Sequence, residues 1–203
     1  MNVKLAYNIS SISGYNFWQV PKCGTTTVKH EILKRLKPEA LQKIDEVCAW
    51  IHNIKEFTFL TPEQANSNEN YNFTFIRNPR SRFESLFKDC CLHRNLIPNL
   101  YKQSPETLLS ELYKAKFSTR PADGSNSFQN VHLRPISYFL KEFKGDIFNI
   151  DDLSCDKINR RKEKYNMSPE IKSHVDILWA EDFELLNQSK DIASFTRVLE
   201  KLS

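Results

Sequence analysis

Residues 21–27, Pro-Lys-Cys-Gly-Thr-Thr-Thr, have the composition of an anion-binding loop. They follow an apolar stretch, residues 16–20, that is typical of a strand, and they open a segment with helical periodicity. The apolar face of that helix comprises Val28, Ile32, Leu33 and Leu36. A strand, a tight turn and a helix N-terminus bind phosphate because backbone N–H groups and the positive end of the helix dipole point at the anion.

Each residue type in this loop adds to that chemistry. Gly24 lets the backbone approach an anion closely, the threonine hydroxyls add donors, and Lys22 adds a positive charge. The pattern is not the G-x-x-x-x-G-K-[ST] loop of many nucleotide-binding proteins, because Lys22 precedes the only glycine of the loop. We therefore expect the loop to hold one phosphate-like group rather than a triphosphate with magnesium.

A second anion motif follows the strand predicted at residues 72–76. Arg77 falls at the carboxyl end of that strand, and Ser85 falls about two turns into the helix that continues the segment. Both side chains could therefore reach one further anion. Of the other two arginines in this motif, Arg80 and Arg82, one is expected to face solvent or to pair with Glu84 or Asp89.

The two segments, VPKCGTTT and FIRNPRSRFESLF, resemble the two cofactor motifs of sulfotransferases that use 3′-phosphoadenosine 5′-phosphosulfate (PAPS). They look most like the carbohydrate O-sulfotransferase branch, and the resemblance extends loosely over residues 16–186. In that family the first motif holds the 5′-phosphosulfate, and the second holds the 3′-phosphate through its leading Arg and its Ser. The cofactor-binding residues implied are Lys22, Cys23, Gly24, Thr25, Thr26, Thr27, Arg77 and Ser85. The resemblance implies PAPS as co-substrate and no metal.

Sulfuryl transfer to an alcohol requires that the acceptor hydroxyl lose a proton and that charge on the departing phosphate be neutralised. Lys22 suits the second role. His132 is the best candidate base, since a neutral imidazole accepts a proton near pH 7. In some members of the resembled family a catalytic histidine lies between a long acceptor loop and a late strand. Here residues 117–131 form such a loop, which is expected to shape the acceptor site.

The base has other candidates. Glu31 on the first helix is one, because some branches of the resembled family place a catalytic glutamate there. The remaining candidates are His30, His52 and His93. The basic run Arg160-Arg-Lys162 could touch the 3′-phosphate or the acceptor, although such a run is more often a solvated face.

The pattern of predicted elements indicates an α/β fold. Strands are expected at residues 16–20, 72–76 and 146–150, with a weaker one near 46–51. Helix starts are expected at Thr61-Pro62, Ser104-Pro105 and Ser168-Pro169. Alternating strands and helices predict a mostly parallel sheet flanked by helices, with ligands at the carboxyl ends of its strands. The resemblance implies the sulfotransferase fold, which is similar to that of P-loop nucleotide kinases, and the length of 203 residues predicts a single domain, residues 1–203.

Composition limits the partners. The 29 basic and 25 acidic residues give a net charge of +4, too mild an excess to predict nucleic-acid binding. No apolar run reaches the roughly 18 residues of a membrane span, and the N-terminus has no signal-peptide core. The five cysteines have no metal-ligand spacing, which favours reduced thiols and a cytoplasmic protein.

The sequence therefore predicts transfer of a sulfuryl group from PAPS to an acceptor hydroxyl. The acceptor is expected to be a carbohydrate, a glycan or another small alcohol. Two alternatives stay open: a P-loop-type nucleotide kinase or NTPase, and a non-catalytic nucleotide-binding relative. The sequence leaves the oligomeric state open.

Overall fold

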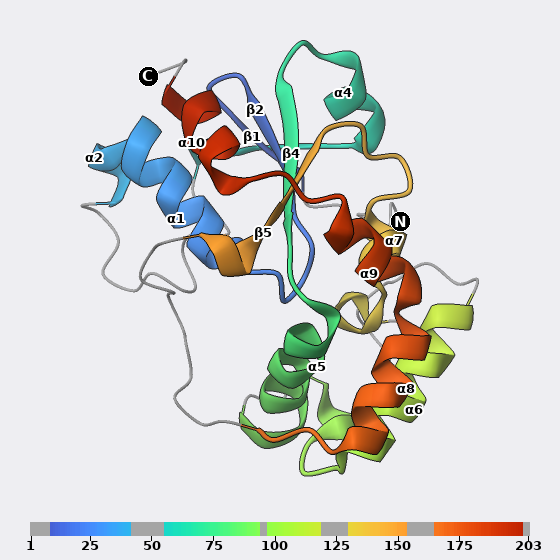
Figure 1. Cartoon of the computed structure of the whole chain (residues 1–203). Helices are drawn as coiled ribbons and strands as arrows, with labels where there is room; N and C mark the ends of the chain where they lie inside the picture. Colours follow the sequence, from blue (N-terminus) through green and yellow to red (C-terminus); the bar gives the residue numbers. More distant parts are fainter. Residues whose placement is uncertain (1–8, 42–54, 94–96, 119–129, 154–164, 201–203) are drawn as a thin grey trace, which may run out of the picture. The chain divides into compact units, whose positions relative to one another are not determined.

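The computed structural model describes residues 9–41, 55–93, 97–118, 130–153 and 165–200, which contain both strands and helices (Figure 1). The chain divides into two units, each assembled from three segments. The sheet unit comprises Tyr7–Arg77, Glu142–Lys162 and Gln188–Ser203. The helical unit comprises Met1–Ala6, Asn78–Lys141 and Glu163–Asn187. A single domain over residues 1–203 stays a prediction.

The sheet unit contains a five-stranded sheet with the order β3-β1-β2-β4-β5. The strands are β1 (Ile9–Ile12), β2 (Tyr15–Trp18), β3 (Thr58–Leu60), β4 (Tyr71–Ile76) and β5 (Asp146–Asn149). The centre is parallel: β2 pairs with β4 and β4 pairs with β5, so all three end at the same edge. β1 is antiparallel to both of its neighbours. The α/β prediction is confirmed, with a mixed sheet around a parallel centre.

The antiparallel part of the sheet arises from a turn that the sequence analysis did not recognise. Ser13 and Gly14 connect β1 to β2, with φ angles of 47° and 83°. Positive φ at both central residues of a two-residue loop is the geometry that matches the twist of a hairpin. The strands predicted at residues 16–20, 72–76 and 146–150 are present with slightly different ends. The weaker prediction near 46–51 lies outside the described residues.

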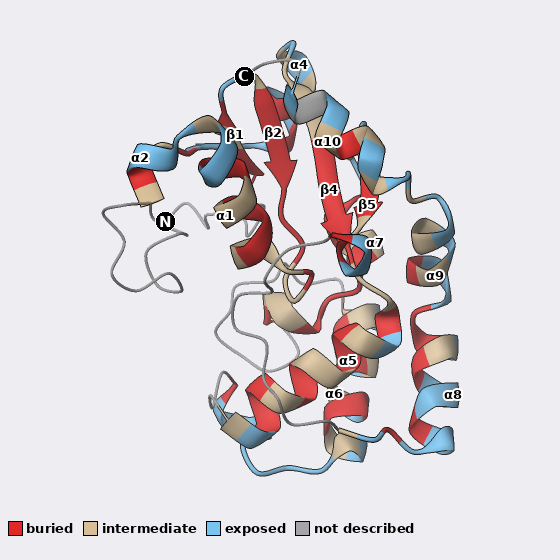
Figure 2. Ribbon diagram, turned by 60° about the vertical axis from the view of Figure 1, so that its left-hand side comes forward, coloured by how far each residue is buried: buried red, intermediate tan, exposed pale blue. Residues whose placement is uncertain are grey.

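The central strands of this sheet are largely buried (Figure 2), and its two faces differ in chemistry. One face is apolar and aromatic, and it forms a core with α1 (Thr25–Leu36) and α10 (Ile192–Glu200). On the other face Asn16, which is fully buried, donates from Nδ2 to the carbonyl of Ala65 on α4 (Pro62–Ser67) at 3.1 Å. The parallel centre is therefore covered on both faces, and its loops at the carboxyl edge carry the candidate site.

The helical unit has its own core. Its helices are α5 (Pro79–Phe87), α6 (Pro105–Phe117), α7 (Ile136–Phe139), α8 (Pro169–Leu178) and α9 (Ala180–Asn187), with a π-helical turn at Lys88–His93 and a 3₁₀ turn at Val131–Leu133. Buried side chains of α5, α6 and α8 form one apolar cluster that includes Trp179. The predicted helix starts are confirmed, since the side chains of Thr61, Ser104 and Ser168 each cap the helix that follows.

Candidate active site

The loop between β2 and α1 is a tight turn held by its own backbone. The N–H of Cys23 donates to the carbonyl oxygen of Val20 at 3.2 Å, and the Thr25 hydroxyl donates to the same oxygen at 3.3 Å. Lys22 and Gly24 both have left-handed backbone, with φ angles of 67° and 77°. A lysine rarely adopts this conformation, and such local strain concentrates at functional sites.

The N-terminus of α1 carries no neutralising group of its own. Gly24 is the N-cap, so the helix begins at Thr25 with no side-chain cap, and its first turn contains no acidic residue. Gly24, rather than Thr25 or Thr26, thus occupies the capping position. An uncapped N-terminus with an undiminished dipole is suited to bind an anion.

Glycine is required at position 24 for two separate reasons. Its φ of 77° is strained for any residue with a Cβ. A Cβ added there would also lie 2.6 Å from Cγ1 of Ile150, in the 3₁₀ turn that follows β5. The loop therefore packs directly on the 3₁₀ turn that follows β5, and this contact fixes the loop at the carboxyl edge of the sheet.

Arg77 follows the last residue of β4, and β4 is parallel to β2. Arg77 and the loop after β2 therefore leave the sheet at the same edge. The Nε atom of Arg77 is buried and has no hydrogen-bond partner among the described residues. A buried donor without a partner is costly in the free protein, so this guanidinium fits a site for an anionic ligand. Lys22, Gly24 and Arg77 therefore follow strands that end at the same edge of the sheet, and their role in holding the cofactor stays a prediction.

Ser85 and His132 belong to the helical unit and are described within it. Ser85 is half-buried on α5, and His132 is half-buried in the 3₁₀ turn. Their place beside the loop stays a prediction. The Oδ1 atom of Asn130 accepts a hydrogen bond from the backbone N–H of His132 at 3.0 Å and lies 2.7 Å from its Nδ1.

Arg82 holds the backbone around His132. Its Nη2 donates to the carbonyl of Arg134 at 2.6 Å and lies 3.4 Å from the carbonyl of His132. The guanidinium of Arg82 is fully buried and lies 4.8 Å from the centre of the Trp179 ring. A buried cation with carbonyl acceptors and an aromatic face is a fixed element of the structure.

The residues after Arg134 are held by Asp182. Its two carboxylate oxygens accept from the N–H groups of Ile136 and Ser137, at 2.8 and 2.9 Å, which caps the start of α7. Burial raises the pKa of Asp182, while the charge of Arg82 and the two backbone donors oppose that rise. The backbone on both sides of His132 is therefore tied to buried side chains.

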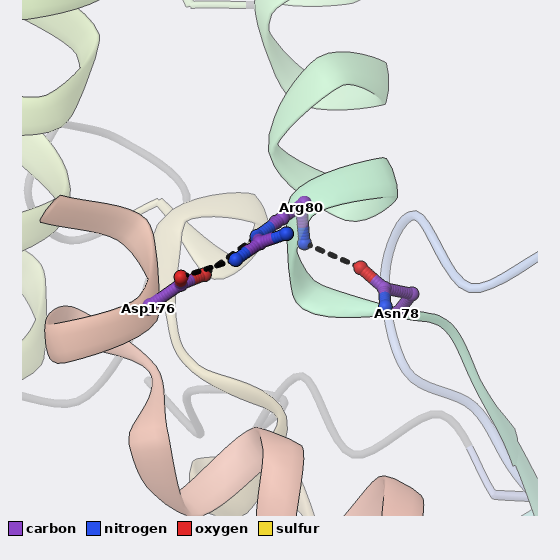
Figure 3. A network of polar contacts seen from close by, with 3 residues as sticks. All are labelled: Asn78, Arg80 and Asp176. Carbon is purple, nitrogen blue, oxygen red and sulfur yellow. Dashed lines mark hydrogen bonds and ion pairs between the residues drawn. The ribbon is translucent and has the colours of Figure 1, made fainter. Parts of the chain in front are cut away.

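Arg80, the other arginine of this motif, has a separate role (Figure 3). Its side chain is half exposed, and its guanidinium makes two contacts to the carboxylate of Asp176 on α8, with Nε to Oδ1 at 2.7 Å. Its backbone N–H donates to Oδ1 of Asn78, the N-cap of α5. Arg80 thus links α5 to α8, and its partner is Asp176 rather than Glu84 or Asp89.

The other candidates for the base lie on different elements. Glu31 is half-buried on α1 in the sheet unit, with Oε1 3.9 Å from Nδ1 of His30. His93 ends the π-helical turn of the helical unit. His52 and the basic run at 160–162 lie outside the described residues, as does most of the loop predicted at 117–131. Glu31 therefore stays an alternative.

Sequence reasoning missed Asn130 and the burial of Arg82. Asn130 had a local signal, because Asn side chains commonly accept from the backbone N–H two residues later. Arg82 had no local signal, because its partners are distant in the sequence: Arg134 lies 52 residues further along the chain, and Trp179 lies beyond it.

Among the cysteines, Cys23, Cys90 and Cys91 are buried free thiols, while Cys48 and Cys155 lie outside the described residues. Burial raises the pKa of Cys91 to about 11. In the described part of the chain, no helix has the length and apolar character needed to cross a membrane.

Of three comparisons with known proteins, one gives a match. No curated protein and no solved structure matches the chain. A model of the sulfotransferase family matches residues 10–151, more than half of the chain, and its range includes both anion motifs. The mixed sheet with a parallel centre is consistent with the fold of these enzymes. The chain therefore belongs to the sulfotransferase family, the enzymes that transfer a sulfuryl group from PAPS to a small acceptor.

Proposed function

We propose that this protein is an O-sulfotransferase whose acceptor hydroxyl lies on a carbohydrate or another small alcohol. In this proposal the loop from Lys22 to Thr27 holds the 5′-phosphosulfate of PAPS, and Arg77 with Ser85 holds the 3′-phosphate. One observation supports it: the uncapped N-terminus of α1 and the buried Nε of Arg77, which has no hydrogen-bond partner among the described residues, both follow strands that end at the same edge of the sheet.

The residues have distinct roles in the transfer. A bond forms between the acceptor oxygen and sulfur, and the bond from sulfur to the bridging phosphate oxygen breaks. Lys22 neutralises the charge that develops on that oxygen, which is stronger stabilisation in the transition state than in the ground state. His132 takes the proton of the acceptor hydroxyl.

The setting of the reaction is also part of the proposal. The carbohydrate acceptor follows from the branch that the two motifs resemble. We infer that no metal takes part, because the loop offers a site for one phosphate-like group beside two basic side chains. A cytoplasmic setting agrees with the buried free thiols of Cys23, Cys90 and Cys91.

The test uses two matched lysine variants. Lys22→Ala removes a lysine from left-handed backbone in the loop, and Lys102→Ala removes one with nearly the same backbone, φ 60°, from the helical unit. Turnover is measured as transfer of labelled sulfuryl from PAPS to a panel of sugars and small alcohols. Lys22→Ala should lower turnover by on the order of 100-fold, and Lys102→Ala should leave it unchanged.

Two results would contradict the proposal. The first is equal turnover in the two variants, which would remove Lys22 from the transition state. The second is phosphoryl transfer from ATP with magnesium at rates above sulfuryl transfer to every acceptor, which would favour the kinase alternative.

A further inference from the structure

The contacts of Asn130 fix the orientation of its own side chain. The backbone N–H of His132 can only donate, and it points at the amide end of Asn130 at 3.0 Å. The atom that receives it must therefore be the carbonyl oxygen, since the NH₂ group has no lone pair to offer. Asn130 is buried, with 7% of its surface exposed, so the orientation is set by the protein rather than by solvent.

The same oxygen then fixes the state of the imidazole. It lies 2.7 Å from Nδ1 of His132, and a carbonyl oxygen can only accept. Nδ1 must therefore carry the hydrogen, because a bare Nδ1 would set two lone pairs against each other at hydrogen-bond distance. In a neutral ring the hydrogen on one nitrogen leaves the lone pair on the other, which here is Nε2.

We propose that Asn130 is a positioning residue that holds His132 as the Nδ1–H tautomer, with Nε2 as the nitrogen that takes the acceptor proton. The catalytic part of this inference rests on the proposed function, in which His132 is the base. The tautomer itself follows from the hydrogen bonds alone. Asn130 acts through His132, and no contact of Asn130 with a substrate is needed.

The surrounding backbone supports this assignment. Arg82 donates to the carbonyl of Arg134 at 2.6 Å. The carboxylate of Asp182 accepts from the backbone N–H groups of Ile136 and Ser137. The backbone that carries His132 is therefore held independently of Asn130. Loss of the Asn130 amide should change the ring more than the fold.

The first test reads the tautomer without substrate. Nitrogen-15 NMR of the histidine rings, with His132→Gln to assign the signals, distinguishes a nitrogen that carries hydrogen from one with a lone pair. The wild-type protein should show hydrogen on Nδ1 in the neutral ring. Asn130→Asp, whose carboxylate also accepts from both groups, should keep it, and Asn130→Leu should shift the ring toward Nε2–H.

The second test measures turnover in the same variants. Asn130→Leu should lower kcat by about tenfold or more, as expected when a catalytic histidine loses the group that sets its tautomer, with KM for PAPS unchanged. Asn130→Asp should restore most of kcat. Ser104→Ala, which removes the helix cap of α6 in the same unit, is the control and should leave kcat and the ring signals unchanged.

Hydrogen on Nε2 in the wild-type protein would overturn the inference, as would an Asn130→Leu protein with an unchanged ring and unchanged kcat. Failure of the proposed function gives a different pattern. If no acceptor is sulfated, the NMR signals of the free protein still decide the tautomer. Because the wild-type and Asn130→Asp proteins answer that question by themselves, poor folding of Asn130→Leu would not remove the test.

Discussion

Lys29 lies on α1, two residues beyond the proposed anion loop, and its ammonium group is buried in an aromatic environment. The side chain is 0% exposed, and Nζ has no hydrogen-bond partner among the described residues. Nζ lies over the rings of Phe57 and Phe59, whose centres are 4.9 and 5.3 Å away. Burial lowers the pKa of Lys29 from 10.5 to about 8. We predict that Lys29→Met stabilises the protein.

The magnitude follows from these contacts. A pKa lowered from 10.5 to about 8, at about 1.4 kcal/mol for each pH unit, corresponds to about 3 kcal/mol of unfavourable free energy for the buried charge at pH 7. Loss of the cation–π contacts offsets about 1 kcal/mol of the gain. Methionine keeps the unbranched shape, so we expect the free energy of unfolding to rise by about 2 kcal/mol.

The sign of the pH dependence can also be stated. The pKa of Lys29 in the folded protein is below its value in the unfolded chain, so the unfolded chain binds more protons between about pH 8 and 10.5. Wild-type stability from this residue therefore rises with pH over that window. The advantage of Lys29→Met should be full at pH 7 and should shrink toward pH 10.

The assay is urea denaturation of both proteins at pH 7 and at pH 10. Lys34→Met, at an exposed lysine of the same helix, is the control and should change the free energy of unfolding by about 0.5 kcal/mol or less. An unchanged or lower stability of Lys29→Met at pH 7 would refute the reasoning. A gain that stays the same at pH 10 would show that the charge is not its cause.

Three further predictions concern Gly24, Asp182 and Cys91. Gly24→Ala should destabilise the protein in urea and abolish binding of adenosine 3′,5′-bisphosphate in calorimetry, because its Cβ would meet Ile150 at 2.6 Å on left-handed backbone; unchanged binding would mean that the loop adapts. Asp182→Asn should lower the free energy of unfolding by about 2 kcal/mol, since an amide has one oxygen for two backbone donors; stability equal to wild type would show that one donor suffices. Cys91, with its pKa raised to about 11, should resist iodoacetamide at pH 8 and react on unfolding in urea, as followed by mass spectrometry of its peptide; rapid labelling of the native protein would contradict its burial.

Local signals in the sequence explain which elements could be predicted. The starts of α4, α6 and α8 follow from a capping side chain and a proline within a few residues, and the structure confirms all three. β1 lacked such a signal. Its buried Ser10 accepts a hydrogen bond from Gln19 across the hairpin at 2.6 Å. Because a polar residue occupies a buried position, the strand lacks the apolar periodicity by which strands are recognised.

The same division applies to the candidate site. The loop at Lys22 and Gly24 could be predicted because strand, turn and helix start are consecutive in the chain. The burial of Arg77 Nε without a hydrogen-bond partner among the described residues could not be predicted, because it depends on which groups the fold places around this atom. The burial of Arg82 depends on Trp179, which is distant in the sequence and meets it only through packing of the helices.

Binding of adenosine 3′,5′-bisphosphate without metal tests the central claim most directly. Calorimetry in the presence of a chelator should show one site on the wild-type protein, tighter than the binding of ATP with magnesium. Arg77→Ala should weaken this binding by about 2 kcal/mol, the size of a hydrogen bond to a charged group. At 100 times the dissociation constant the ligand should stabilise the fold by about 2.7 kcal/mol. Tighter binding of ATP with magnesium, or binding of adenosine 3′,5′-bisphosphate that is unchanged in Arg77→Ala, would contradict the assignment of the site.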